Sequence, residues 1–214
     1  MKPGHLSLDV ELRREPWGPM MERRRLHLGC GVHLLEGWLN VDGVAEPKSE
    51  DSVVEGFIVQ GRVGHPDRVL DIQGGLWQLK SDAYEWVYWC HGPEHIAPDK
   101  LPEVLKHLHR ILAPGGKLTV STTSFEGIYL HRFLEQDDGC DYKAALFADT
   151  RSTAHPYDMH RNVFTFEELC ELFAAAGFAR VRPWKPEEYQ EIAALGDYST
   201  TARKVSVYAE GIKA

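Results

Sequence analysis

A pair of glycines and one acidic residue give the first indication of ligand binding in this chain. Gly29 and Gly31 come directly after the apolar alternation of Leu26 and Leu28, and Asp42 ends the next short apolar segment. Glycine after a buried strand lets a ligand lie against bare backbone, and a carboxylate at the end of the neighbouring strand accepts the hydroxyl groups of a ribose. The pattern therefore predicts a nucleoside-containing ligand. A plain tight turn is the alternative interpretation.

The same segment does not match the binding motif for a dinucleotide such as NAD. That motif has a third glycine and an acidic residue about 20 residues further on. This chain has Leu34 at the third position, and Asp42 follows Gly31 by only 11 residues. The third glycine allows a helix to pack closely beneath a pyrophosphate, which a single adenosine lacks. We therefore expect an adenosine-type ligand.

A second motif, His91-x-x-Glu94-His95, matches the inverted signature of zinc proteases. Zinc chemistry of this kind requires both histidines on one helix face, with the glutamate as the base. Here an apolar segment runs directly into His91, and Gly92 and Pro93 separate the two histidines. A continuous helix is therefore disfavoured, and we expect neither a zinc protease nor a bound metal.

Other metal or redox patterns in the chain are weak. His155, Asp158 and His160 are near one another in sequence, but a solvated loop is the favoured interpretation of them. The four cysteines form no Cys-x-x-Cys pair, which argues against a zinc ribbon and against a disulfide framework. We interpret them as small buried residues. They are Cys30, Cys90, Cys140 and Cys170.

The composition predicts a soluble, cytoplasmic protein. The 214 residues include 24 Lys and Arg against 32 Asp and Glu, a formal net charge of −8. This acidic balance disfavours nucleic acid as a partner. No apolar run approaches the ~18 residues of a membrane span, and the first segment of the chain lacks the apolar stretch of a signal peptide. The expected partner is a small-molecule substrate, and the oligomeric state is not predicted.

Apolar patterns along the chain predict an α/β fold. Two segments have one apolar face at the helical period, 101–112 and 166–176. Asp99 is expected to cap the first of these helices, and Thr165 forms a capping box with Glu168 at the second. Strands that alternate with helices predict a mostly parallel sheet. The segments with the pattern of strands are 24–28, 40–43, 69–72, 86–90, 117–121, 179–184 and 204–209.

The rest of the chain is assigned to a leader and two insertions within a single domain. Residues 1–22 form a polar leader, and the domain covers 23–214 with insertions at about 44–67 and 125–163. The aromatic side chains of the second insertion either line a substrate pocket or pack inside a helical cap, and both interpretations stay open. They are Phe125, Tyr129, Phe133, Tyr142, Phe147 and Tyr157.

Seven short motifs follow one another along the chain in a characteristic order. They are Leu26 to Gly31, Gly37 to Asp42, Leu70 to Ile72, His91 to Ile96, Arg110 to Leu118, His160 to Thr165, and Ala176 to Phe178. Their succession resembles the class I S-adenosylmethionine-dependent methyltransferases of the small bacterial type (methyltransferase type 11-like). The resemblance covers about residues 24–209 apart from the insertions.

The resemblance implies a Rossmann-like, doubly wound sheet of about seven strands, mostly parallel with the last strand antiparallel. It implies S-adenosyl-L-methionine as the cofactor. Gly29 and Gly31 would then lie beside its methionine part, Asp42 would bind the ribose, and Asp71 and Ile72 would flank the adenine. The full implied set, including the residues that close the site at the end of the fourth strand, is Gly29, Cys30, Gly31, Asp42, Gly43, Asp71, Ile72, Cys90 and His91.

The resemblance also implies transfer of a methyl group to an oxygen or nitrogen atom of a small molecule or sugar. A hydroxyl acceptor requires a base near the point of attack. His91 is the first candidate for this catalytic role, and His95 and His160 are the next. An amine acceptor needs only an uncharged lone pair. Because the Gly92-Pro93 pair departs from the family pattern, a non-catalytic cofactor-binding partner or sensor protein on the same fold remains the alternative.

Overall fold

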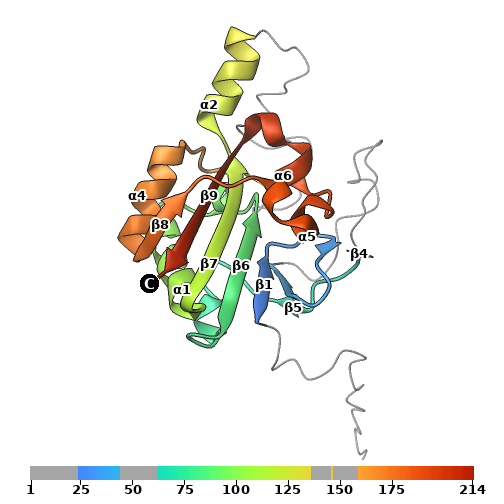
Figure 1. Ribbon diagram of the computed structural model, residues 1–214, viewed down its shortest axis with the longest axis vertical. Helices are drawn as coiled ribbons and strands as arrows, with labels where there is room; N and C mark the ends of the chain where they lie inside the picture. The colour runs from blue at the N-terminus through green and yellow to red at the C-terminus, as the bar shows by residue number, and fades with distance from the viewer. Residues whose placement is uncertain (1–23, 44–61, 136–145, 147–158) are drawn as a thin grey trace, which may run out of the picture.

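A seven-stranded sheet runs through the centre of the molecule (Figure 1). The computed structural model describes residues 24–43, 62–135, 146 and 159–214. The strand order is β5-β3-β1-β6-β7-β9-β8, and β9 is antiparallel to both neighbours whereas the other pairs are parallel. This confirms the expected Rossmann-like sheet with an antiparallel last strand. The strands are β1 (Arg25–Leu28), β3 (Leu39–Asp42), β5 (Arg68–Val69), β6 (Tyr84–Cys90), β7 (Leu112–Thr123), β8 (Phe178–Arg182) and β9 (Ser206–Lys213).

The topology brings one set of loops together. Because β1, β3, β5, β6 and β7 run in the same direction, their carboxyl ends lie at one edge of the sheet, and the antiparallel β9 begins at that edge. In the sheet, β6 lies between β1 and β7. The residues that follow β6 are therefore placed between the loop after β1 and the start of β9. In open α/β sheets this edge holds the ligand.

Two amphipathic helices form where their sequence patterns predict them: α4 has the predicted bounds, and α1 ends one residue early, at Ile111, because Leu112 begins β7. In α4 the hydroxyl of Thr165 accepts from the N–H of Glu168 and the carboxylate of Glu168 accepts from the N–H of Thr165, so the capping box is confirmed. The expected cap of α1 is wrong: Lys100, not Asp99, is the N-cap residue, and no side chain caps it. The carbonyl of Ala97 already accepts from the first N–H groups of this helix, which leaves less for a cap to satisfy. The helices are α1 (Leu101–Ile111), α2 (Phe125–Ile128), α4 (Phe166–Ala176), α5 (Gln190–Ala193) and α6 (Tyr198–Thr201).

Shorter elements connect these parts. None of the helices in the described residues is both long and apolar enough to cross a membrane. A second, two-stranded sheet pairs β2 with β4, next to the glycine turn. These elements are β2 (His33–Leu34), β4 (Arg62–Val63), the 3₁₀ helices η3 (Leu76–Gln78), η4 (Pro93–His95), η8 (Pro186–Glu188) and η9 (Arg203–Val205), and the π-helix η5 (Tyr129–Leu134).

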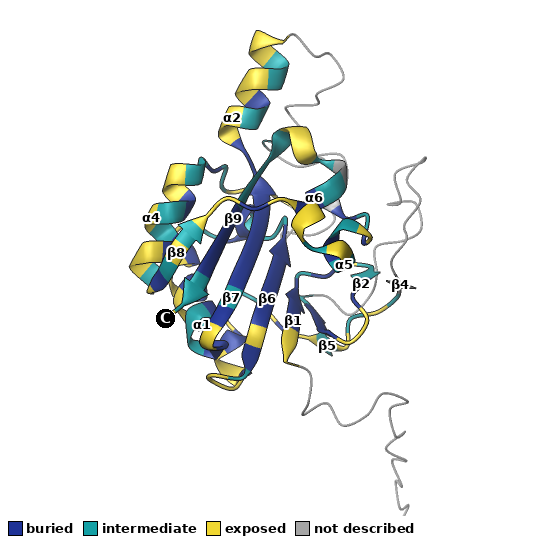
Figure 2. Ribbon diagram, in the orientation of Figure 1, coloured by how far each residue is buried: buried dark blue, intermediate teal, exposed yellow. Residues whose placement is uncertain are grey.

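Strand β6 supplies the centre of both hydrophobic layers. Val87 and Trp89 are fully buried on the face that packs against α1 and α4, and Tyr88 is fully buried on the opposite face with Trp184. Figure 2 shows β6 as mostly buried along its length. An unbroken apolar run is typical of a strand covered on both faces. The prediction for 86–90 is therefore confirmed.

Strand β5 is shorter than the sequence predicts. The pattern at 69–72 suggested a strand through Ile72, but β5 ends at Val69. The N–H of Leu70 still bonds to the carbonyl of Asp42, and the chain then turns, with the N–H of Gly75 bonded to the carbonyl of Asp71. Asp71 and Ile72 consequently lie in a turn at the ligand-binding edge of the sheet.

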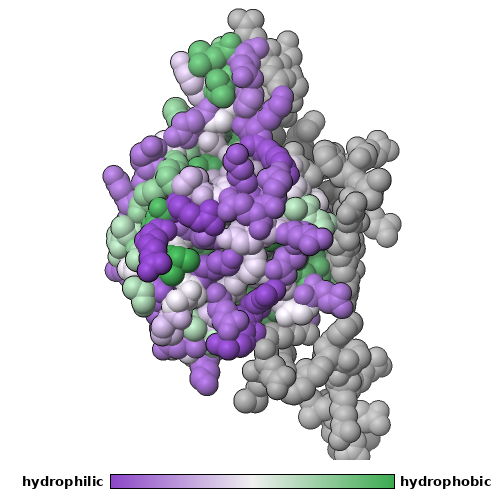
Figure 3. Space-filling model, in the orientation of Figure 1, coloured by the Kyte–Doolittle hydropathy of each residue, from purple (hydrophilic) through white to green (hydrophobic). Residues whose placement is uncertain are grey.

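An arm formed by α2 and η5 projects away from the body of the molecule (Figure 1). Phe125, Tyr129 and Phe133 on this arm are 53 %, 50 % and 56 % exposed, and Figure 3 shows a hydrophobic area at its end. These side chains are therefore not packed in a core. The other predictions for the leader, for 44–61 and for the remaining aromatic residues of the second insertion fall outside the described residues.

Lowering the pH should destabilise the fold through His27. The ring is 1 % exposed, stacks on Tyr88 with 5.1 Å between the ring centroids, and lies 3.2 Å from Oδ1 of Asn40. Burial lowers the pKa of His27 from 6.5 to about 4. The unfolded chain takes up a proton below its pKa of about 6.5, whereas the folded protein does so only near 4. The contribution of uncharged His27 to the free energy of unfolding is therefore complete above pH 6.5. It is lost as the pH falls towards 4, and the loss amounts to about 3 kcal/mol.

Urea unfolding of the wild type and of His27→Phe, at neutral pH and at about pH 4.5, measures this effect. Phenylalanine keeps a ring against Tyr88 but cannot take up a proton. The wild type should therefore lose more of its free energy of unfolding than the variant. An equal loss in the two proteins would contradict the prediction.

Candidate active site

The turn after β1 is built from two glycines in left-handed backbone conformations. Gly29 has φ +62° and Gly31 has φ +51°, values that side chains other than glycine rarely adopt. The N–H of Gly31 donates to Oδ2 of Asp42 at 2.8 Å, which fixes the turn to the end of β3. A Cβ atom added at Gly31 would meet no atom within 4 Å. The backbone of this turn therefore faces open space that a ligand can enter.

The indole of Trp89 lies between this turn and the loop after β6. Its Nε1 would lie 3.5 Å from a Cβ atom at Gly29 and only 1.9 Å from one at Gly92. Glycine at position 92 is therefore required by the indole, which explains why this chain departs from the family pattern there. Trp89 Nε1 is buried and has no hydrogen-bond partner among the described residues.

His91 has an unusual backbone and two strong side-chain partners. Its φ is +43°, a strained value for a residue with a side chain, and such values are concentrated at functional sites. Nδ1 of His91 lies 2.6 Å from Oε1 of Glu94, and Nε2 lies 2.8 Å from Oγ of Ser206. Serine, histidine and a carboxylate are thus linked in one chain, an order that orients an imidazole for proton transfer.

Glu94 is a fully buried carboxylate with several donors around it. The hydroxyls of Thr122 and Thr123 donate to its two oxygens at 2.7 Å and 3.0 Å. Burial alone would raise the pKa of Glu94, but the charge and hydrogen bond of His91, with smaller contributions from His95 and His160, lower it to about 2. Glu94 is therefore an anion at neutral pH. Its Oε1 is the atom that Nδ1 of His91 approaches to 2.6 Å.

A cleft of about 820 Å³ opens beside Ser206 at the same edge of the sheet. Its walls come from the end of β7, the segment after β8 and the start of β9. This volume lies within the range of about 300–1,000 Å³ that is typical of small-molecule sites. Residues on the walls include Ser124, Phe166, Trp184, Arg203 and Tyr208.

Comparison with known protein families decides the class of this site. A family model described as a methyltransferase domain matches residues 21–182. The chain belongs to this methyltransferase family. The expected class of enzyme is confirmed, and the family implies S-adenosylmethionine as the cofactor.

Solved structures of other methyltransferases are similar to this methyltransferase in fold. The S-adenosylmethionine-dependent methyltransferase of Archaeoglobus fulgidus has a TM-score of 0.52 and 16 % identity, covering 89 % of this chain and 86 % of that chain. That of Mesorhizobium loti has a TM-score of 0.46 and 14 % identity, covering 91 % and 93 %. A Haloferax volcanii methyltransferase in complex with the Trm112 activator has a TM-score of 0.47 and 16 % identity, covering 88 % and 81 %. No curated protein matches the sequence significantly.

The residues at the glycine turn of this methyltransferase fit the cofactor that the family implies. The open space beside Gly31 admits a ligand, and the buried, unpartnered Nε1 of Trp89 lies below the turn. Cδ1 of Ile72 would lie 3.8 Å from a Cβ atom at Gly29, so the segment after β5 borders the same space. The structure thus brings together residues that the sequence motifs place far apart. The carboxylate of Asp71 is exposed next to this segment.

The two cysteines of the predicted cofactor site are buried thiols. Burial, with a further contribution from nearby carboxylates, raises the pKa of both Cys30 and Cys90. The carboxylate of Asp197, which accepts from the hydroxyl of Tyr88 at 2.5 Å, lies on the same side as Cys90. A thiol with a raised pKa is a poor nucleophile, in agreement with the interpretation of these cysteines as packing residues.

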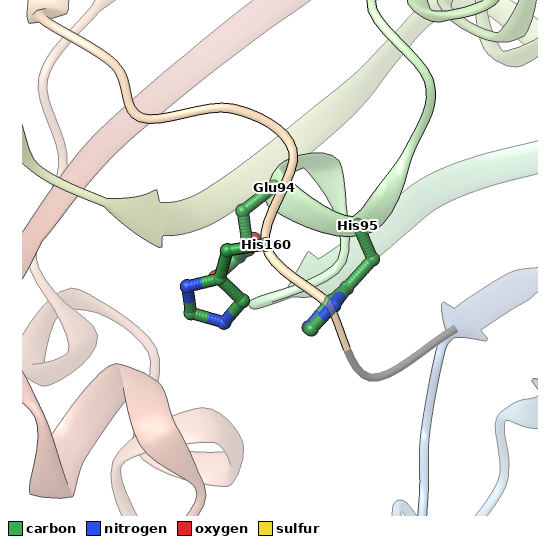
Figure 4. Close-up of side chains that lie close together, drawn as sticks. All are labelled: Glu94, His95 and His160. Carbon is green, nitrogen blue, oxygen red and sulfur yellow. The ribbon is translucent and has the colours of Figure 1, made fainter. Parts of the chain in front are cut away.

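Three of the predicted histidines lie around one carboxylate. His91 bonds to Glu94, and the rings of His95 and His160 lie 4.7 Å apart between centroids, next to the same glutamate (Figure 4). The zinc-protease arrangement is not formed, because η4 spans only Pro93–His95 and His91 lies outside it. His155 and Asp158 fall outside the described residues.

The partners that orient His91 and Glu94 do not follow from the motifs of the sequence. Ser206 is 115 residues from His91, and no local pattern distinguishes it. Thr122 and Thr123 belong to a run of four hydroxyl residues, 121–124, at the end of an apolar strand. Such a polar run at the ligand-binding edge of a sheet was the available signal. Asp197 is buried, and no pattern in the sequence around it indicated this.

Proposed function

We propose that this enzyme transfers a methyl group to a hydroxyl oxygen of a small molecule bound in the cleft beside Ser206. The observation that supports this most directly is the position of His91. It follows β6 between the glycine turn and the cleft, and it is bonded to both Ser206 and Glu94. The cleft volume of about 820 Å³ agrees with a small acceptor such as a metabolite or sugar.

The cofactor is held at the carboxyl ends of β1, β3 and β6 in this proposal. Gly29 and Gly31 bind its methionine part, Asp42 its ribose, and Asp71 and Ile72 border its adenine. S-adenosylmethionine supplies a methyl group that is already activated for transfer. The protein therefore mainly positions the acceptor and excludes water. The other residues in the proposed binding set are Cys30, Gly43, Cys90 and His91.

His91 acts as the base through Ser206. The hydroxyl of Ser206 donates to the carbonyl oxygen of Ala202 at 2.7 Å and lies 2.8 Å from Nε2 of His91, to which it can donate instead when that nitrogen is unprotonated. Before transfer, Ser206 donates to His91. As the acceptor gives its proton to Ser206 Oγ, the proton of Ser206 passes to Nε2 of His91, and Glu94 stabilises the imidazolium at Nδ1. Ser206 then turns its new proton to Ala202.

His95 and His160 are the next candidates for the base. They lie next to Glu94, in positions that are partly exposed. An acceptor that reaches the site from their side would use one of them instead of His91. An amine acceptor would use none of the three.

Thermal unfolding tests the choice of cofactor. S-adenosylmethionine or its demethylated product, S-adenosylhomocysteine, should raise the melting temperature, because a ligand that binds the folded state stabilises it by mass action. NAD should not raise it, because the turn lacks the third glycine of the dinucleotide motif. In addition, Asp42 follows Gly31 by only 11 residues, whereas the motif has its acidic residue about 20 residues further on. A larger shift with saturating NAD would contradict the assignment.

Release of S-adenosylhomocysteine tests the reaction. The protein is incubated with S-adenosylmethionine and a library of small hydroxyl compounds, sugars and amines, and the product is measured by mass spectrometry. Release that depends on one hydroxyl acceptor supports the proposal. Binding of the cofactor without release in the presence of any acceptor supports a non-catalytic binding protein.

A further inference from the structure

A second cluster of donor atoms lies beside Glu94, outside the chain of contacts that links it to Ser206. Glu94, His95 and His160 each offer one ligand atom, and these atoms all lie within 4.8 Å of one another (Figure 4). Ligand atoms about 2.0–2.2 Å from a tetrahedral zinc ion lie roughly 3.3–3.6 Å apart. Small rotations of the two imidazoles therefore bring the three atoms to the spacing that a metal ion requires.

Main-chain contacts hold the two segments of the cluster together. The carbonyl of Glu94 accepts from the N–H groups of Arg161 and Asn162 at 2.6 Å and 3.2 Å. The side-chain amide of Asn162 donates to the carbonyl of Ile96 at 2.6 Å. The segment that carries His160 is thus fixed against the η4 helix. Little conformational entropy would be lost when an ion binds.

Hydrogen bonds from neighbouring groups orient both the carboxylate ligand and an imidazole ligand, as they do in metal sites. Thr122, Thr123 and His91 donate to the carboxylate of Glu94 and fix its plane. Nδ1 of His95 lies 3.3 Å from the carbonyl oxygen of Met159, and a hydrogen bond there places the lone pair of the ring on Nε2. A backbone carbonyl or carboxylate at the second ring nitrogen is the usual support of a metal-binding histidine.

We propose that Glu94, His95 and His160 bind a divalent transition-metal ion of the zinc type. Two imidazoles and one carboxylate are a ligand set for zinc and for related first-row ions, whereas Mg²⁺ and Ca²⁺ favour oxygen ligands alone. A divalent cation would compensate the negative charge of the fully buried Glu94 carboxylate.

The proposed site departs from the expectation that the chain binds no metal. That expectation followed from the zinc-protease motif, in which His91 and His95 are ligands and Glu94 is the base. In the structure Glu94 is itself the candidate ligand, and His160, 65 residues after His95, takes the place of His91. The inference concerns binding alone and does not depend on the proposed methyl transfer.

The site has three protein ligands and an open side. His95 and His160 are partly exposed, and Met159 beside them is 51 % exposed. The remaining coordination positions are therefore accessible to water. Three protein ligands plus water are typical of zinc sites that bind an exogenous oxygen ligand, whereas structural zinc sites have four protein ligands.

Calorimetry with zinc chloride tests the proposal on the full chain without a purification tag. After removal of metal with a chelator and dialysis, the protein should bind one equivalent of Zn²⁺, confirmed by elemental analysis. His95→Ala and His160→Ala should each weaken binding by more than about 10-fold. His107→Ala, which removes a partly exposed histidine on α1, is the matched control and should bind as the wild type does. The absence of a stoichiometric site, or equal affinity in the wild type and both ligand variants, would overturn the proposal.

Cobalt spectroscopy gives an answer that does not depend on loss of binding. Co²⁺ replaces Zn²⁺ in such sites, and His160→Cys would place a thiolate among the ligands. The variant should then show a sulfur-to-cobalt charge-transfer band in the near ultraviolet that the wild type lacks. A variant that folds, as judged by circular dichroism, and shows no such band would place the ion elsewhere and refute the site. Neither measurement requires S-adenosylmethionine or an acceptor, so a negative result here is separate from failure of the proposed reaction.

Discussion

Replacing His91 by alanine should lower the rate of methyl transfer to a hydroxyl acceptor by about 10²- to 10⁴-fold, the usual contribution of a general base. The imidazole is linked to Ser206 on one side and to Glu94 on the other. Without the imidazole, no nitrogen base accepts the proton that passes from the acceptor through Ser206. Cofactor affinity should fall much less, because His91 acts on the acceptor's proton rather than on the adenosine.

The experiment pairs two measurements on each variant: titration of the cofactor and single-turnover methyl transfer with an acceptor found by screening. Loss of His91 also leaves Glu94 as a buried carboxylate without its closest partner, which is destabilising. His91→Gln controls for this, because the amide can donate to Glu94 but cannot act as a base. It should therefore fold more stably than His91→Ala and be about as slow.

The outcomes separate the possible roles of His91. A slow variant with near-normal cofactor affinity identifies the base. If affinity, stability and rate all fall together in both variants, His91 only supports the loop after β6. Full activity in His91→Gln would remove His91 as the base and direct the search to His95 and His160.

Replacing Asp42 by alanine should weaken binding of S-adenosylmethionine by about 10- to 150-fold. This range corresponds to the loss of roughly 1.5–3 kcal/mol for a hydrogen bond to a charged group. The structure adds a second contribution, because Oδ2 of Asp42 also accepts from the N–H of Gly31 at 2.8 Å. The carboxylate would hold both the ribose and the turn that contacts the rest of the cofactor.

Titration calorimetry on Asp42→Ala and Asp42→Asn distinguishes these contributions. Asparagine keeps one oxygen to accept from Gly31 but lacks the charge and the second acceptor for a ribose diol. If the ribose contact dominates, both variants should bind weakly. If the turn is what matters, Asp42→Asn should bind nearly as well as the wild type. An unchanged dissociation constant in Asp42→Ala would show that the ribose lies elsewhere.

The local elements of this protein could be predicted because each depends on neighbours in the chain. The capping box of Thr165 and Glu168 spans three residues, and the apolar face of α1 repeats every three or four. The unbroken run in β6 indicated a strand covered on both faces. The glycine turn is equally local. Two glycines after one strand, with Asp42 at the end of the next, predict an adenosine-type ligand.

The departures also have local causes. The carbonyl of Ala97 bonds to the first N–H groups of α1 and so takes the place of a cap from Asp99. Strand β5 ends at Val69 because the chain turns after a single further bond to β3. Apolar periodicity indicates which residues are buried, but it does not indicate which group a backbone N–H or carbonyl will hydrogen-bond.

The contacts around His91 and Glu94, by contrast, were decided by tertiary structure. Ser206 meets His91 across 115 residues because β9 returns antiparallel to β7, with Thr123 opposite Ser206. The same edge places Thr122 and Thr123 against Glu94. His160 reaches Glu94 because two main-chain N–H groups that follow it bond to the carbonyl of residue 94. The sequence named the histidines as candidates, but their partners follow from strand order and register, which are set by the packing of the whole sheet rather than by any segment of the chain.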